Sequence, residues 1–345
     1  MPLSRSTTSD VTFLQVEPTT RCNYTCGFCC GRHMDQSDQS WDDFEATLDA
    51  FPHLRHIEIQ GEGEPLMHPR FFDMTAAAHA RGIKVSTITN GSLLGRRVPE
   101  ILDSGIASLL VSIESADAKG FRAIRGGTLD VVTRGIARLM DARRARGQAA
   151  PAVGFALTVL AETQDQLNPV FDLYERLDMD GGILCHMLSD MTPYSRHYDD
   201  DMCRQVLSPL NQSLMWARYA RNTKRATYRE APVRHFWNDL MARPAEDEPA
   251  AARASASTFT RCPWLEHALF VNRHGLATGC PNVKDTARFS FGHVRIDTAS
   301  SILAGRDAMR TQLAAGEIPD ACRGCFIADS ITRSRHTEPR SAQQP

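Results

Sequence analysis

The sequence has no long hydrophobic run and no excess of charge of either sign. Nowhere do about 18 apolar residues follow one another, which argues against a membrane-spanning helix. The N-terminal stretch MPLSRSTTSDVTFLQ has neither the apolar segment nor the cleavage site of a secretion signal. The formal net charge of the 345 residues is −2, with acidic and basic residues interspersed. We therefore expect a cytosolic protein that binds neither nucleic acid nor a membrane.

The sequence also lacks an internal repeat, but it does not lack cysteine. It has ten cysteines and no export signal. In a reducing compartment, metal binding or catalysis explains so many thiols better than disulfide bonds do. Hydrophobic residues make up 42% of the chain, which is enough for a packed core. The spacing of the cysteines is therefore the main guide to function.

Short apolar or β-branched runs alternate with helical patterns between residues 11 and 190, which is typical of βα units and a parallel sheet. The predicted strands are 13–16, 57–60, 85–89, 108–113, 153–159 and 183–187. The predicted helices are 41–51, 71–81, 98–104, 129–146 and 164–177. We predict an α/β fold with a partial (β/α)6 TIM-like barrel, open on one side, and a site at the C-terminal ends of its strands.

The rest of the chain changes in composition. Residues 243–257, RPAEDEPAAARASAS, are rich in proline, alanine and charge, as linkers are. The segment after them contains four cysteines but too little apolar periodicity for an independent core, so a metal could supply the missing stability. We predict the barrel over residues 1–198, a helical bridge and linker over 199–258, a small C-terminal metal-binding domain over 259–330, and a polar, disordered tail over 331–345.

Three cysteines lie close together directly after the first predicted strand. Cys22, Cys26 and Cys29 belong to the run R-C-N-Y-T-C-G-F-C. A compact loop at the mouth of a barrel can present three thiolates to one iron–sulfur cluster, and a four-iron cluster with only three such ligands keeps one iron open. Zinc is the alternative, because Cys30 or His33 could complete a set of four ligands.

This run resembles the radical S-adenosylmethionine (SAM) superfamily, whose hallmark is three cysteines with three and then two residues between them. In that family the aromatic residue before the last cysteine packs near the adenine, and a Gly-Gly-Glu-Pro loop after the second strand contacts the amino group of SAM. Here the loop is Gly61-Glu62-Gly63-Glu64-Pro65, and Glu62 replaces the first glycine of the strict form. The resemblance covers residues 12–190. It implies cofactor contacts at Phe28, Gly63, Glu64 and Pro65.

Two further strand ends fit the resemblance. Asn90 ends the third predicted strand in a Thr-Asn-Gly run, and Ser112 and Glu114 end the fourth. The resemblance implies that Asn90 lies at the cofactor site and that Ser112 and Glu114 reach the ribose or the methionine carboxylate; solvated polar residues at a strand end are the alternative. The implied reaction is reductive cleavage of SAM to a 5′-deoxyadenosyl radical that abstracts a substrate hydrogen. It also implies a low-potential electron donor such as flavodoxin or ferredoxin.

Four more cysteines lie in the C-terminal part. Cys262 and Cys280 flank a hairpin-like segment, and Cys322 and Cys325 form a C-R-G-C pair. Four thiolates suit a closed [4Fe-4S] cluster or zinc, and taken alone zinc would be favoured. The segment also resembles the SPASM or shorter twitch extension of the superfamily, which implies one auxiliary [4Fe-4S] cluster. No cysteine follows Cys325, so a second auxiliary cluster is not expected.

Three cysteines, Cys30, Cys185 and Cys203, remain without a metal role, and burial as small apolar residues is the default for them. Cys185 lies on the sixth predicted strand, where its thiol could donate a hydrogen atom to a substrate radical. The polar residues nearby that could bind substrate are His186, Asp190, Tyr194 and His197.

Three functions remain open. The first is an oxidoreductase or epimerase that dehydrogenates or epimerises a small polar metabolite, carbohydrate or aminocyclitol-like. The second is a maturase that modifies a ribosomally made peptide; because only about a dozen residues precede the first strand, we expect no built-in peptide-recognition domain there, which leaves room for a separate recognition protein. The third is a non-catalytic iron–sulfur or zinc interaction protein, against which the run Gly63-Glu64-Pro65 and the open three-cysteine site argue.

Overall fold

The computed structural model describes residues 7–8, 11–230 and 259–337, and one continuous sheet organises this part of the chain. Its nine strands lie in the order β6-β5-β4-β3-β2-β1-β7-β8-β9. The first six are parallel, and each pairs with the strand that follows it in the sequence. They are β1 (Phe13–Val16), β2 (His56–Ile59), β3 (Lys84–Thr89), β4 (Ile106–Ile113), β5 (Ala152–Val159) and β6 (Ile183–Met187).

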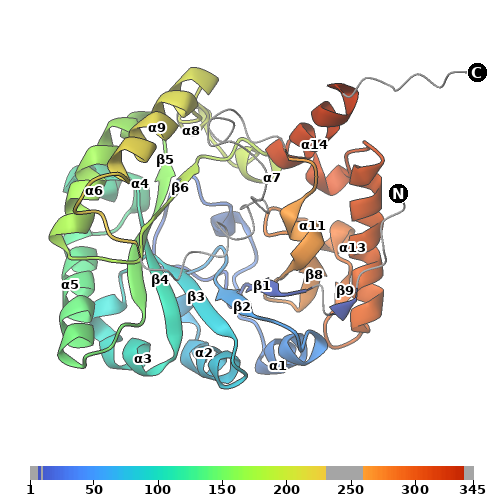
Figure 1. Ribbon diagram of the computed structural model, residues 1–345, viewed down its shortest axis with the longest axis horizontal. Helices are drawn as coiled ribbons and strands as arrows, with labels where there is room; N and C mark the ends of the chain where they lie inside the picture. Colours follow the sequence, from blue (N-terminus) through green and yellow to red (C-terminus); the bar gives the residue numbers. More distant parts are fainter. Residues whose placement is uncertain (1–6, 9–10, 231–258, 338–345) are drawn as a thin grey trace, which may run out of the picture.

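Helices cover the outside of these six strands, which curve into an open barrel (Figure 1). The helices are α1 (Trp41–Ala50), α2 (Phe71–Ala80), α3 (Val98–Asp103), α4 (Ala118–Arg125), α5 (Leu129–Ala145) and α6 (Leu167–Arg176). Each predicted strand and helix of the barrel overlaps an observed one. The predicted partial (β/α)6 barrel is therefore confirmed.

The strands of the barrel are buried on both faces, which explains why they can be recognised in the sequence. Every residue of β5 except Thr158 is buried. Parallel strands covered by helices on one side and by the barrel interior on the other form nearly continuous apolar runs. Helix starts carry equally local signals: the Ser40 hydroxyl accepts a hydrogen bond from the Asp43 backbone N–H at 3.1 Å and so caps the N-terminus of α1.

Helix α4 is the barrel helix that our prediction misses. It is short, but both of its ends are marked. The Asp117 carboxylate accepts a hydrogen bond from the Gly120 backbone N–H at 2.7 Å, and Gly126 follows the last turn with a φ of +70°. An N-cap aspartate and a left-handed glycine after the helix are standard boundary signals. They place Arg125, the last residue of α4, beside the cysteine loop.

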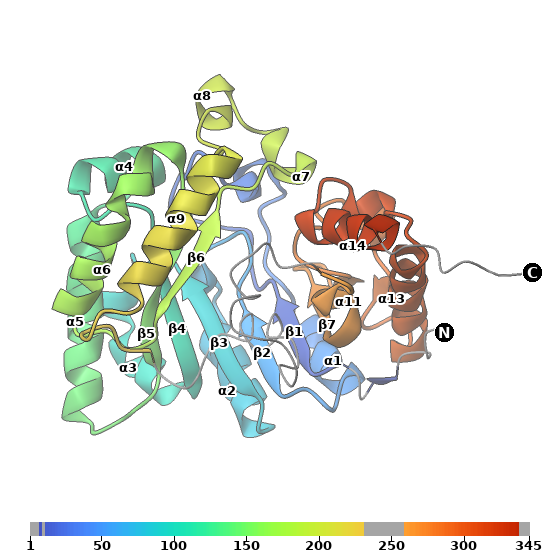
Figure 2. The same cartoon turned by 45° about the horizontal axis from the view of Figure 1, so that its top comes forward.

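The C-terminal part extends the barrel sheet. Strand β7 (Ala268–Val271) pairs in parallel with β1, and β8 (Leu276–Thr278) and β9 (Gly292–His293) follow antiparallel. The Phe13 ring of β1 packs edge-on against Trp264, with ring centroids 5.7 Å apart. Figure 2 shows the helices of this part gathered on the β7–β9 side of the sheet. They are α11 (Pro263–His267), α12 (Thr286–Phe289), α13 (Ala299–Ala314) and α14 (Phe326–Thr337).

Between β6 and the C-terminal part the structure describes three further helices. They are α7 (Thr192–Ser195), α8 (Asp200–Cys203) and α9 (Pro209–Asn222). The predicted linker at 243–257 lies outside the described residues, and α14 reaches into the stretch predicted as a disordered tail. The predicted domain boundaries stay predictions. Among the described helices, none combines the length and the apolar character needed to cross a bilayer.

Candidate active site

The first three cysteines lie in the loop between β1 and the 3-10 turn Cys30–His33, at the C-terminal edge of the parallel strands. Burial raises the pKa of Cys26 to about 11 and that of Cys29 to about 12, and the charges of neighbouring cysteines add to both rises. The three thiols Cys22, Cys26 and Cys29 therefore lie close enough to influence one another. Buried thiols that lie near one another ionise readily only when a cation or a bound metal compensates the negative charge of the thiolate.

Each of these thiols contacts a polar group from a different part of the barrel. Asn90 Nδ2, after β3, lies 3.7 Å from Cys22 Sγ. Arg125 Nη1, at the end of α4, lies 3.8 Å from Cys26 Sγ. These donors would hydrogen-bond to the sulfurs of a bound cluster, an interaction that tunes its potential. The loop therefore fits a three-thiolate cluster site.

The loop after β2 is fastened to the cysteine loop by its backbone. The Gly63 N–H donates to the Thr19 carbonyl at 3.1 Å, and the Glu64 N–H donates to the Arg21 carbonyl at 2.8 Å. A Cβ atom at position 63 would lie 2.5 Å from the Thr19 oxygen, so no side chain fits there. Pro65 begins the 3-10 turn Pro65–Met67 directly after this contact. The predicted cofactor loop and the cysteine loop thus form one unit.

The Glu64 carboxylate is buried, and it accepts hydrogen bonds from neighbouring groups of its own chain. It accepts hydrogen bonds from the Thr89 hydroxyl and the Asn90 backbone N–H, both at 2.6 Å, and from the Leu66 backbone N–H at 3.2 Å. Burial raises the pKa of Glu64, and these hydrogen bonds oppose the rise. Glu64 therefore ties the ends of β2 and β3 together. Its predicted contact with the amino group of SAM remains a prediction.

Glu114, at the end of β4, forms a buried ion pair with Arg125. Arg125 Nη2 lies 2.6 Å from Glu114 Oε1, and Arg125 Nε binds the other carboxylate oxygen. The same guanidinium contacts Cys26, so Glu114 helps to position Arg125 against the cysteine loop. Arg125 is not among the site residues predicted from the sequence; the caps of α4 are the signal that could have identified it. Ser112 and Phe28 are both half-buried, and their cofactor roles stay predictions.

Four cysteines of the C-terminal part come together from three segments. Cys262 precedes α11, Cys280 follows β8, and Cys322 and Cys325 bracket a turn before α14. Burial raises the pKa of Cys262 to about 12 and that of Cys280 to about 11, and each of these thiols is also influenced by the charge of Cys325. Four mutually close thiols fit the donor set of a [4Fe-4S] cluster.

Within residues 7–8, 11–230 and 259–337, no group of three or more histidine, cysteine, aspartate or glutamate side chains is arranged to hold a single metal ion. The thiolates around a [4Fe-4S] cluster each bind a different iron, so they stand farther apart than ligands that share one ion. The ligand roles of both cysteine sets stay predictions.

Cys185 does not face the cysteine loop. Its side chain is 7% exposed, and its Sγ lies 3.7 Å from the sulfur of Met215 on α9. Successive residues of a strand point to opposite faces, and the next residue, His186, is exposed. This placement favours the alternative that Cys185 is a buried apolar residue. Its role as a hydrogen donor stays an untested prediction.

A polar contact joins the cysteine loop to the C-terminal part, and the sequence analysis did not predict it. The Lys284 side chain, only 7% exposed, pairs with the Glu62 carboxylate. Its ammonium also lies 5.1 Å from the centre of the Tyr194 ring, and the Tyr194 hydroxyl donates to Asn282 Oδ1 at 2.9 Å. Tyr194, one of the predicted substrate-binding residues, thus lies at this junction.

Another predicted substrate-binding residue, His197, contacts the turn that follows the cysteine loop. The His197 ring stacks on His33, with centroids 4.3 Å apart, which holds the segment after β6 against the cysteine loop. Asp190 is exposed.

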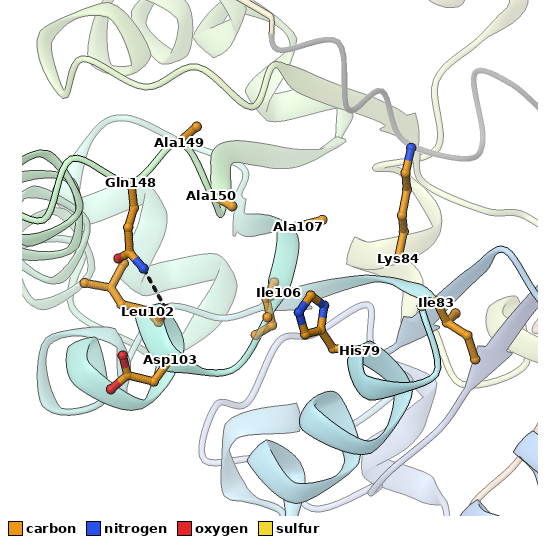
Figure 3. A pocket seen from close by; sticks show the side chains of 12 residues that line it. His79, Ile83, Lys84, Leu102, Asp103, Ile106, Ala107, Gln148, Ala149 and Ala150 are labelled. Carbon is orange, nitrogen blue, oxygen red and sulfur yellow. Dashed lines mark hydrogen bonds between the residues drawn. The ribbon is translucent and has the colours of Figure 1, made fainter.

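A cavity of 780 Å³ lies at the opposite end of the barrel. Lys84 and Ile106, at the N-terminal ends of β3 and β4, line it together with His79 (Figure 3). Asn90 and Glu114 follow the other ends of the same strands. In α/β barrels chemistry takes place at the C-terminal ends of the strands, so this cavity is not part of the candidate active site.

Comparison with known proteins agrees with this geometry. Residues 16–173 match the family described as the Radical SAM superfamily. The chain is 30% identical over 188 residues to the tungsten-containing aldehyde ferredoxin oxidoreductase cofactor-modifying protein of Pyrococcus furiosus, an alignment that covers 52% of each protein. The chain thus spans about half the length of this curated relative.

Two solved structures share the fold. SuiB of Streptococcus suis bound to its precursor peptide SuiA has a TM-score of 0.63 at 13% identity, covering 85% of this chain and 64% of SuiB. The protein anSMEcpe with bound S-adenosylmethionine has a TM-score of 0.64 at 13% identity, covering 91% of this chain and 86% of anSMEcpe. At these identities the likeness shows the fold alone.

Proposed function

Because residues 16–173 form a radical SAM domain, we propose that the chain is an enzyme that takes a hydrogen atom from a small polar substrate, leading to dehydrogenation or epimerisation. The observation that carries the proposal is the position of Cys22, Cys26 and Cys29 at the C-terminal edge of the barrel, hydrogen-bonded through their loop to Gly63 and Glu64. Three thiols leave one iron of a cluster open for SAM.

When bound at these thiols, a [4Fe-4S] cluster with SAM supplies an electron and a 5′-deoxyadenosyl radical. The chain's own residues position that chemistry. Asn90 and Arg125 offer N–H donors toward Cys22 and Cys26. Glu64 fixes the loop on which the amino group of SAM would bind, and the stacked His33 and His197 rings hold the segment after β6 against the cysteine loop.

We propose that Cys262, Cys280, Cys322 and Cys325 hold one auxiliary [4Fe-4S] cluster. Their four thiols supply a complete ligand set, so this cluster would have no open iron. A cluster on this side of the barrel could accept an electron from a substrate radical. Flavodoxin or ferredoxin is the expected donor for the core site.

The polar junction supports a small polar substrate. The Lys284 side chain is buried and Tyr194 and Asn282 are half-buried beside the cysteine loop, and polar groups of this kind can orient a small ligand. The second candidate is a maturase acting on a peptide. It is favoured by the fold shared with SuiB, which was solved with a precursor peptide.

The test of the core reaction is a pair of cysteine variants. Cys26→Ala should abolish formation of 5′-deoxyadenosine by anaerobically reconstituted, reduced protein. Cys203→Ala, which changes an exposed cysteine on α8, should leave it unchanged. Undiminished cleavage by the Cys26 variant would refute the assignment. Deuterium transfer into 5′-deoxyadenosine from carbon-deuterated polyols or aminocyclitols, compared with deuterated peptides, then decides between the two substrate classes.

A further inference from the structure

Glu62, the second residue of the predicted SAM-binding loop Gly61–Pro65, makes contacts with three different parts of the chain. Its carboxylate pairs with Lys284, and its second carboxylate oxygen lies 3.8 Å from Cys29 Sγ. Its backbone N–H donates to the Glu17 carboxylate, at the end of β1, at 3.1 Å. One residue therefore contacts the predicted cluster ligand Cys29, the barrel and the C-terminal part at once.

Lys284 is placed by the loop that begins at Cys280. It lies four residues after that cysteine and before α12, so no helix or strand fixes it. Its position depends on the ends of this short loop and on the contacts to Tyr194 and Glu62. A change in the order of Cys280 is therefore expected to change the position of Lys284.

A second cation from the C-terminal part, Arg273, contacts Glu17, whose carboxylate also binds the backbone of Glu62. Arg273, in the turn between β7 and β8, has a side chain only 6% exposed. Its Nη1 lies 3.3 Å from the Glu17 carboxylate, and its Nε donates to the Ser37 hydroxyl at 2.9 Å. Glu17 thus connects Arg273 with the backbone of Glu62. The loop Gly61–Pro65 is therefore held by two cations that the C-terminal part provides.

We infer that the C-terminal four-cysteine site controls SAM affinity at the core through the Lys284–Glu62 ion pair. This inference rests on the proposed function. Metal binding at Cys280 orders the loop that carries Lys284, and Lys284 holds Glu62 and the SAM-binding loop in their binding geometry. The coupling is reciprocal, because if metal binding changes the affinity for SAM, SAM binding must change the affinity for the metal by the same factor. Lys284 is a positioning residue in this scheme, because it acts through Glu62.

The test measures SAM affinity by equilibrium dialysis, and iron content, on the reconstituted protein. Lys284→Met should leave the iron content unchanged and weaken SAM binding by about tenfold. Lys284→Arg, which keeps the charge, should restore most of the affinity. Arg288→Met is the matched control: Arg288 lies four residues further along and forms an exposed ion pair with Asp320. It should bind SAM like the unchanged protein.

A double-mutant cycle decides whether the pair carries the coupling. Cys322→Ala with Cys325→Ala should weaken SAM binding about as much as Lys284→Met, while the core iron remains. Adding Lys284→Met to that variant should then cause no further loss. Additive losses, or unchanged affinity in Lys284→Met, would overturn the inference. The melting temperatures of the metal-free variants show whether each one folds. If the unchanged protein itself binds no SAM, the proposed function fails instead.

Discussion

Arg125 joins two buried groups near the cysteine loop, the Glu114 carboxylate and the Cys26 thiol. It neutralises Glu114 in the interior and reaches Cys26. Removing one partner of a buried ion pair leaves the other charge buried without compensation, which costs about 3–5 kcal/mol. Arg125→Met should therefore lower the free energy of unfolding by this amount in urea denaturation.

Two further variants make that prediction specific. Arg122→Met, on the exposed side of the same helix, should change the free energy of unfolding little. Adding Glu114→Gln to Arg125→Met should recover part of the loss, because the stranded charge is then removed. A double variant no more stable than Arg125→Met would show that the lost contacts of the guanidinium, and not the charge of Glu114, explain the cost.

Glu64 allows a second residue-scale prediction. Glu64→Ala should weaken SAM binding without removing iron, since a hydrogen bond from the ammonium group of SAM to a carboxylate is worth about 1.5–3 kcal/mol. Titration calorimetry with SAM and an iron assay on the same sample measure both quantities. The structure sharpens the outcome: if iron is lost as well, the hydrogen bonds of Glu64 to Thr89 and Asn90 are what hold the cysteine loop.

At the scale of elements, local signals account for what could be predicted. The strands of the barrel are buried on both faces, so their apolar runs stand out, and β1 and β6 begin and end where predicted. Helix α4 was missed because its apolar face is short. The Lys284–Glu62 pair could not be predicted, because it joins residues far apart in sequence whose proximity depends on the pairing of β7 with β1.

The N-cap of α4 provides a prediction at this scale. Asp117→Ala removes the hydrogen bond to the Gly120 backbone N–H and should cost about 1 kcal/mol of folding free energy. Asp117→Asn keeps an accepting oxygen and should cost much less. Thermal unfolding of both variants measures the difference. Equal losses would mean that the charge of Asp117, and not its capping bond, stabilises α4.

For the whole molecule, the iron content tests both metal assignments together. One cluster at each cysteine set gives about eight irons per chain, and Cys322→Ala with Cys325→Ala should lower this to about four. Iron and zinc are measured on anaerobically reconstituted protein. About four irons with one tightly held zinc in the unchanged protein would reject the auxiliary cluster, and about twelve irons would require ligands that we have not assigned.

The pairing of β1 with β7 has a consequence for the order of events during synthesis. Phe13 pairs with His56 on one side and with Ala268 on the other. While the ribosome is still translating the middle of the chain, β1 therefore has one partner and an unsatisfied edge, and such edges recruit other strands. Domains fold as they emerge, but this barrel cannot complete its sheet until the C-terminal part is made. The nascent barrel would thus expose this edge of β1 to other strands until β7 is made, and pairing with β7 ends that exposure.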